Sequence, residues 1–187
     1  QAWDSSWDER SRAAGLDRNE LLALASIVEA EATDPAERPT IAAVYRNRLR
    51  HSMPLDADPT VEYAILLRHG ERKGRLSDGD YLIDSPWNTY RRMGMPPGPV
   101  GNPSRQAIEA VLDPAKVPYT YFVAGADGKS RFATTYAEHL RNIRQIRRKQ
   151  EPGAPEATPS HRDPVPWHPR TKLRTPSYTL AVPAVLD

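Results

Sequence analysis

Two glutamates, Glu29 and Glu31, lie in the segment ASIVEAEA, where a helix is expected to bury its apolar face. At about 100° per residue, both fall within the arc formed by the neighbouring leucine, isoleucine and alanine side chains. Burying an unpaired carboxylate costs several kcal/mol, so each carboxylate must be paired, neutral or at the edge of a cleft. A desolvated glutamate with a raised pKa can act as a general acid.

A structural ion pair is the alternative for these two glutamates. The following helix carries Arg46 and Arg48, and either could reach back to a carboxylate on its neighbour. The residue pattern by itself leaves both the catalytic and the structural interpretation open.

Helix signals place these glutamates on the first of several helices. Asp17 and Glu20 form a capping-box pattern ahead of a helix that runs to about Ala32, and Asp34, Pro35 and Glu37 predict a second start. Apolar spacing and Pro or Asn start signals then predict helices at about 35–49, 60–68, 104–112 and 137–149. The first two helices are expected to pack as a hairpin.

A β-hairpin is predicted near the end of this helical region. YTYFVA and RFATTY read as strands, with Asp127 and Gly128 in the connecting turn. The sequence therefore predicts an α+β fold that is mostly helical, with a small antiparallel hairpin or sheet. The long Gly- and Pro-rich segment Gly70–Gly101 is expected to form one side of a cleft beside the glutamate helix.

Composition divides the chain into a polar lead-in at residues 1–15, one domain at 16–150, and a Pro-rich tail or wrapping arm at 151–187. The net charge of +2 does not require a nucleic-acid partner. The lack of cysteine excludes disulfides, Cys-ligated zinc and thiol catalysis. No apolar run reaches the roughly 20 residues that span a bilayer. Because the sequence begins at Gln1, an anchor preceding it is compatible with this pattern.

Several motifs occur in a fixed order: ASIVEAEA, DPTVEY, SPWNTY, GMPPGPVGNP, YTYFVAG and FATTYAEH. Together they resemble the MltG (YceG-like) family of endolytic murein transglycosylases, over about Leu21 to Arg148. The resemblance implies a bacterial cell-envelope enzyme that cuts within the glycan strands of peptidoglycan. It also implies that Glu29 is the catalytic residue and that Glu31 supports it.

The implied chemistry needs one carboxylic acid and neither metal nor cofactor. The glutamate protonates the glycosidic oxygen and then accepts the proton of the 6-hydroxyl of the same muramic acid, which closes a 1,6-anhydro ring. The histidines show no metal-ligand spacing.

The cleft must also hold the sugar. The candidate substrate-binding residues from SPWNTY are Ser85, Trp87, Asn88, Thr89 and Tyr90, with Trp87 as a stacking platform. The alternative is a loop that these residues hold together through their own hydrogen bonds. Asp56, Asp58 and Thr60 are further candidates, although an Asp before Pro is also a common helix cap.

Three positions depart from the family pattern. Asp56 stands where glutamine is usual, Trp87 where tyrosine is usual, and Leu140 where asparagine is usual. Asp56 could supply a second carboxylate, which leaves a lysozyme-like hydrolase as an alternative to the transglycosylase. A non-catalytic glycan-binding module is the other alternative.

The resemblance implies peptidoglycan strands as the binding partner and cell-wall synthases as candidate protein partners. It places the enzyme at the extracytoplasmic face of the inner membrane, held there by a segment outside this chain. A binder of nucleic acid or another anionic polymer is a further alternative, through Arg141, Arg144, Arg147, Arg148 and Lys149. These residues cover more than one helix face, and a solvated basic helix end is the commoner explanation of such a pattern.

Overall fold

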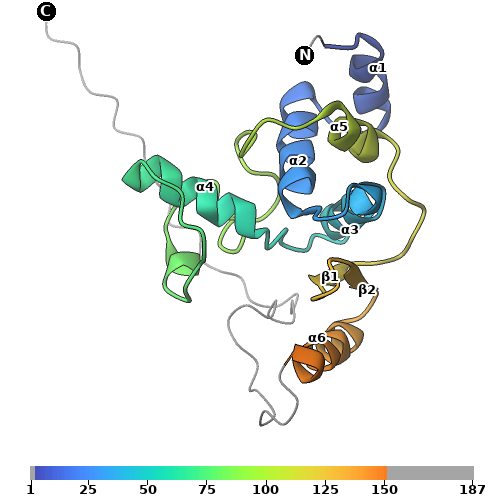
Figure 1. Cartoon of the computed structure of the whole chain (residues 1–187). Helices are drawn as coiled ribbons and strands as arrows, with labels where there is room; N and C mark the ends of the chain where they lie inside the picture. The colour runs from blue at the N-terminus through green and yellow to red at the C-terminus, as the bar shows by residue number, and fades with distance from the viewer. Residues whose placement is uncertain (1–2, 151–187) are drawn as a thin grey trace, which may run out of the picture.

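The structure is a computed structural model that describes residues 3–150 (Figure 1). The predicted tail at 151–187 lies outside the described residues. In chain order the elements are α1 (Ser6–Ala13), α2 (Arg18–Glu31), the 3-10 turn η1 (Pro35–Glu37), α3 (Arg38–Arg50), α4 (Asp58–His69), the 3-10 turn η2 (Asp80–Leu82), α5 (Arg105–Leu112), β1 (Tyr121–Ala124), β2 (Ser130–Ala133) and α6 (Tyr136–Gln150). The predicted α+β class is confirmed.

Helix α2 forms the centre of the helical part, where it packs against α5 and α3 (Figure 1). Its start is the predicted capping box: the Asp17 carboxylate accepts the Glu20 backbone N–H at 2.7 Å, and the Glu20 carboxylate accepts that of Asp17 at 2.9 Å. Every residue from Ala23 to Val28 is buried. Both sides of α2 are therefore covered by protein along this stretch.

The second helix starts later than its capping pattern predicts. The Asp34 carboxylate accepts the Ala36 N–H at 2.9 Å, which produces the turn η1, and α3 begins at Arg38. The Glu37 carboxylate does not close a capping box, because it accepts the N–H of Ser130 at 2.9 Å. A bond across the fold has replaced the expected local one.

Residues 6–13, expected to belong to a polar lead-in, form helix α1 and contribute to the core. Trp7 is only 2% exposed and belongs to the main hydrophobic cluster. Its indole N–H donates to Glu109 on α5 at 2.7 Å, and Arg10 pairs with the same carboxylate at 2.7 Å. A buried tryptophan in a polar segment, with a carboxylate on α5 as acceptor for its N–H, thus docks α1 on α5.

The hairpin lies between the helical part and α6 (Figure 1). Strands β1 and β2 are antiparallel, with Phe122 opposite Phe132. Gly128 has φ +74°, a left-handed conformation that suits glycine in the turn. Helix α6 packs on both strands, and β1 also touches α3, so the hairpin joins the last helix to the bundle.

Candidate active site

A cavity of about 410 Å³ opens where α2, α3, the start of α4, the segment following η2, β1 and α6 meet. It is lined by Glu31, Tyr45, Arg48, Asp56, Asp58, Tyr81, Tyr90, Phe122, Val123, Ala124, His139, Ile143, Ile146 and Arg147. The expected cleft between the glutamate helix and the 70–101 segment is thus present, and the hairpin and α6 supply a further wall. The lining combines charged and hydroxyl groups with apolar side chains, which suits a sugar because a sugar has both polar edges and apolar faces.

Glu31, the last residue of α2, is part of the cavity lining. Its carboxylate accepts the Tyr45 hydroxyl at 3.0 Å. Burial raises the pKa of Glu31, the nearby charge of Asp58 raises it further, and the Tyr45 hydrogen bond and Arg48 only partly oppose them, so the pKa reaches about 7. Glu31 can therefore both hold and release a proton near neutral pH.

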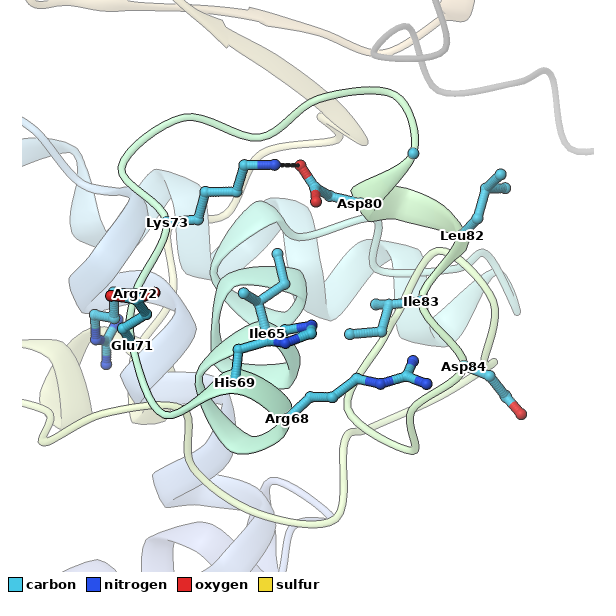
Figure 2. A pocket seen from close by; sticks show the side chains of 11 residues that line it. Ile65, Arg68, His69, Glu71, Arg72, Lys73, Asp80, Leu82, Ile83 and Asp84 are labelled. Carbon is cyan, nitrogen blue, oxygen red and sulfur yellow. Dashed lines mark hydrogen bonds and ion pairs between the residues drawn. The ribbon is translucent and has the colours of Figure 1, made fainter.

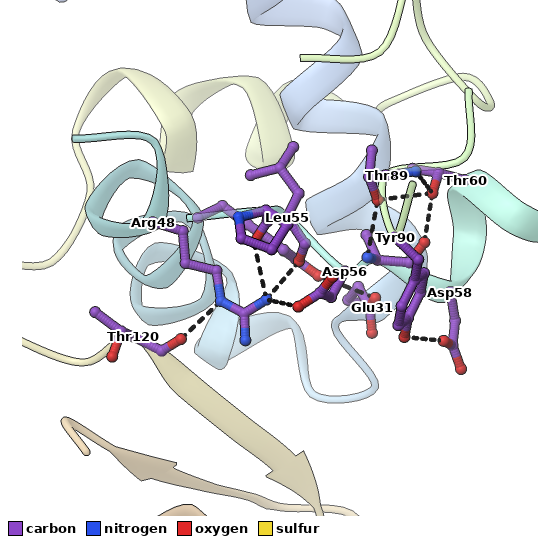
Figure 3. Close-up of polar contacts among 12 residues, drawn as sticks. Glu31, Arg48, Leu55, Asp56, Asp58, Thr60, Thr89, Tyr90 and Thr120 are labelled. Atoms are coloured by element: carbon purple, nitrogen blue, oxygen red, sulfur yellow. Dashed lines mark hydrogen bonds and ion pairs between the residues drawn. The ribbon is translucent and has the colours of Figure 1, made fainter. Parts of the chain in front are cut away.

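Asp58 faces the cavity from the first turn of α4. One of its carboxylate oxygens accepts the Tyr90 hydroxyl at 2.6 Å (Figure 3). The other accepts the Tyr81 hydroxyl at 3.3 Å. Asp58 does not cap α4, because the N-cap position of this helix is Ala57. Burial and the Asp58 charge hold the pKa of Tyr90 far above its usual range, which keeps that hydroxyl a donor.

Asp56 also lines the cavity, and its backbone is unusual. Its φ is +47°, a left-handed conformation that a non-glycine residue adopts at a cost of order 1 kcal/mol. The carboxylate lies 3.4 Å from Arg48, whose guanidinium also donates to Leu55 O and Thr120 O at 2.7 Å each (Figure 3). Burial raises the pKa of Asp56 to about 6 although Arg48 opposes the shift.

Glu29 has different surroundings, outside the cavity lining. Arg38 pairs with its Oε1 at 2.7 Å, and the Ser104 hydroxyl and backbone N–H donate to its Oε2. Partial burial raises the pKa of Glu29, but the Ser104 hydrogen bonds and the Arg38 charge outweigh it and leave the pKa below its ordinary value. These contacts argue against the general-acid role expected for Glu29 and support the structural alternative.

The partner of Glu29 is not one of the two arginines considered from the sequence. Arg46 donates to the Ala14 carbonyl at 2.7 Å, and Arg48 belongs to the cavity. Arg38 reaches Glu29 because it begins α3, directly after the turn η1.

Most of the predicted sugar-binding residues hold the loop together. Asn88 is fully buried and donates to the carbonyls of Tyr81 and Ile83 at 3.0 and 2.8 Å. The Thr60 and Thr89 hydroxyls lie 2.9 Å apart, and Thr89 accepts the Ala57 N–H at 3.0 Å. These bonds tie the 70–101 segment to the start of α4 and thereby place Tyr90 and Asp58 in the cavity.

Ser85 and Trp87 also lie outside the cavity lining. The Ser85 hydroxyl accepts the Trp87 backbone N–H at 3.3 Å. The Trp87 ring packs against Tyr63, with ring centroids 5.6 Å apart, and against the main core. Trp87 is therefore not placed as a sugar-stacking platform, and Tyr90 is the SPWNTY residue that reaches the cavity.

Other cavity residues carried no recognisable signal in the sequence. Tyr45 reads as part of an apolar helix face, and Tyr81 lies in an unpatterned loop. His139 lies in the lining and stacks on Tyr121, with 5.3 Å between the ring centroids. Arg147 was read as part of a solvated helix end, but it also lines the cavity.

The known proteins that this chain resembles share one name. The chain is 46% identical over 121 residues to an endolytic murein transglycosylase of Bacillus subtilis, covering 65% of this chain and 32% of that protein. It is 38% identical over 138 residues to the endolytic murein transglycosylase of Streptococcus pneumoniae strain D39, covering 71% and 24%. The chain thus spans about a quarter to a third of the length of these relatives.

A solved structure agrees with these relatives. The crystal structure of a yceG-like protein from Listeria monocytogenes matches with a TM-score of 0.66 and 38% identity, over 73% of this chain and 43% of that one. The sequence also matches the YceG-like family over residues 1–145. The chain therefore belongs to the YceG-like family.

Proposed function

We propose that this chain contains the catalytic domain of an endolytic murein transglycosylase. It would cleave the bond between N-acetylmuramic acid and N-acetylglucosamine within a glycan strand and leave a 1,6-anhydro-muramic acid end. The observation that carries the proposal is Glu31, a partly buried carboxylic acid with a pKa of about 7 in the lining of the cavity. The names of the relatives support the substrate class.

Glu31 takes the acid and base roles in this proposal, in place of Glu29. Protonated Glu31 donates its proton to the glycosidic oxygen as the bond from that oxygen to the anomeric carbon breaks. The 6-hydroxyl of the same muramic acid then attacks the anomeric carbon, and its proton passes to the Glu31 carboxylate. The acid is regenerated and no water is consumed, so one residue serves both steps.

The cavity also supplies charge for the transition state. The anomeric carbon becomes positive as the glycosidic bond breaks, and a fixed negative charge nearby stabilises it. Asp58 is suited to this role because two tyrosine hydroxyls hold its carboxylate in place. The same negative charge raises the pKa of Glu31, so one residue both stabilises the cation and keeps the acid protonated.

A hydrolase remains the second candidate because Asp56 lines the same cavity. If its carboxylate directed a water to the anomeric carbon, the products would have free reducing ends. Its contact with Arg48 favours a structural role instead, since a carboxylate that is paired with a guanidinium is a poor base.

The proposal is tested by digesting purified peptidoglycan with the chain and identifying the new ends by mass spectrometry. Anhydro ends, lighter by one water than reducing ends, are expected. Reducing ends would favour the hydrolase, and sugar binding without cleavage would favour a glycan-binding module.

The site of action follows from the substrate. Peptidoglycan lies in the cell envelope, so we propose that the enzyme acts there, with cell-wall synthases as candidate partners. Among residues 3–150, no helix is both long and apolar enough to cross a membrane.

A further inference from the structure

A second cavity, of about 720 Å³, lies at the other end of α4, between that helix and η2 (Figure 2). Its lining consists of Ile65, Arg68, His69, Glu71, Arg72, Lys73, Gly79, Asp80, Leu82, Ile83 and Asp84. Its volume is in the range of sites that bind molecules of drug or short-peptide size. Neither the catalytic proposal nor the family motifs use this cavity.

Two of the three acidic side chains of the lining, Asp80 and Asp84, are engaged in ion pairs, and the third, Glu71, is exposed. Asp80 accepts from Lys73 at 2.6 Å and from the backbone and hydroxyl of Ser77, which lowers its pKa to about 2. Asp84 pairs with Arg92 at 2.8 Å. These contacts neutralise much of the negative charge and fix the loop that forms the rim.

Arg68 is available for a ligand. Its side chain extends along the cavity toward Ile83 and Asp84 (Figure 2). Within residues 3–150, none of the hydrogen bonds and ion pairs uses its guanidinium. A guanidinium is suited to bidentate contact with a carboxylate.

Apolar side chains complete the cavity. Ile65 and Ile83 face one another across it (Figure 2), and Leu82 at the rim is 65% exposed. The cavity thus has a free guanidinium, two carboxylates that are each paired with a basic side chain, and aliphatic walls. This combination fits a short peptide that carries carboxylates and small apolar side chains.

The two cavities are positioned to share one substrate. Asp58 and Arg68 lie ten residues apart on α4, which is about 15 Å at about 1.5 Å per residue. Tyr81 lines the catalytic cavity, whereas its neighbours Asp80 and Leu82 line the second one, so η2 forms a wall common to both. An extended four-residue peptide spans about 13 Å, which is comparable to this separation.

We infer that the second cavity binds the acidic stem peptide carried by the lactyl group of a muramic acid bound in or beside the catalytic cavity, with Arg68 pairing with a peptide carboxylate. The inference rests on the proposed function for its substrate. It implies that the enzyme prefers peptide-bearing strands over strands from which the peptides have been removed.

The first test is binding of the free peptide, which does not depend on catalysis. Isothermal titration with L-alanyl-γ-D-glutamyl-meso-diaminopimelyl-D-alanine is expected to show binding that weakens about tenfold in Arg68→Gln, because a charge-assisted contact is lost. Arg12→Gln is the matched control, since it removes the same charge from an exposed position on α1. No binding to the wild type, or equal binding to Arg68→Gln, would overturn the inference.

The second test compares kcat/KM for peptide-bearing strands and for strands stripped by an amidase. The ratio of the two is expected to exceed one in the wild type and in Arg12→Gln, and to fall about tenfold in Arg68→Gln. An unchanged ratio in Arg68→Gln would refute the stem-peptide site while leaving the transglycosylase proposal intact. If neither strand is cleaved, the proposed function fails, and the titration still decides whether the cavity binds the peptide.

Discussion

Glu29 and Glu31 lie two residues apart on α2, yet their carboxylates point into different parts of the protein. Two residues correspond to about 200° around a helix, so one carboxylate meets Arg38 and Ser104 and the other meets Tyr45 in the cavity. The contacts of Glu29 lower its pKa, whereas the surroundings of Glu31 raise its pKa. The two residues can therefore be separated experimentally.

Replacing Glu31 with glutamine is expected to abolish strand cleavage while leaving the fold intact. Loss of a general acid typically lowers the rate by about 10² to 10⁴, and more when the same group serves as base. Release of soluble muropeptides from peptidoglycan measures the effect, and circular dichroism checks the fold. Glu29→Gln is the matched control and should keep most of the activity. Loss of activity in a well-folded Glu29→Gln protein, with Glu31→Gln active, would return the catalytic role to Glu29.

Replacing Glu29 with alanine is expected to reduce the free energy of unfolding by about 1 to 3 kcal/mol. The change removes an acceptor from two Ser104 donors and leaves the largely buried Arg38 guanidinium without its carboxylate partner. Urea unfolding followed by circular dichroism measures this loss. An unchanged urea midpoint would show that the contacts of Glu29 contribute little to the free energy of unfolding.

The stability of the wild type is expected to fall with rising pH relative to that of Glu31→Gln. The folded-state pKa of Glu31 is about 7, above the ordinary value of 4.5 for a glutamate in an unfolded chain. Between these values the native state binds more protons than the unfolded state, so this contribution is fully present below about pH 4.5 and is lost as pH rises to about 7. The expected change is a few kcal/mol. Asp56 and Glu62, whose pKa values are also raised, contribute with the same sign in both proteins, and only the coupling of Glu62 to Glu31 differs between them. The free energies of unfolding of the two proteins at pH 5 and pH 8 measure this change. The same pH dependence in both proteins would contradict the prediction.

Replacing Asp58 with asparagine is expected to shift the pH dependence of cleavage. The rate should fall as pH rises through about 7, because Glu31 must be protonated to act as acid. Removing the Asp58 charge lowers the pKa of Glu31 and moves this decline to lower pH, and it also lowers the maximal rate. Tyr90→Phe, which removes a hydrogen bond to Asp58 but keeps the charge, should move the decline less. A profile identical to the wild type in Asp58→Asn would remove Asp58 from the mechanism.

Replacing Asp56 with glutamine is expected to leave anhydro ends as the product. If Asp56 only pairs with Arg48 and holds the cavity rim, the amide can occupy the same place without changing the reaction. Mass spectrometry of the products from both proteins provides the comparison. A wild type that yields reducing ends, converted to anhydro ends by Asp56→Gln, would identify Asp56 as the group that directs water.

The sequence alone determined the elements with strong local signals. Asp17 and Glu20 produce the predicted capping box, Asp127 and Gly128 lie in the predicted turn, and the helix and strand ranges agree to within a few residues. These features depend on residues close together in the chain. Helix α1 was missed because its stability comes from Trp7 docking on α5, a contact across more than ninety residues.

The identity and the state of the candidate site residues were decided by the tertiary structure. A helical wheel shows that Glu29 and Glu31 face protein. It does not show that Glu29 contacts Arg38 and Ser104 or that Glu31 lines a cavity. Asn88, Thr89 and Thr60 look equally suited to sugar binding and to loop bonding until the loop is folded onto α4. A carboxylate's pKa depends on burial and on charges and hydrogen bonds within a few ångströms, and those neighbours come from α3, α4 and the start of α5, which only the folded chain brings together.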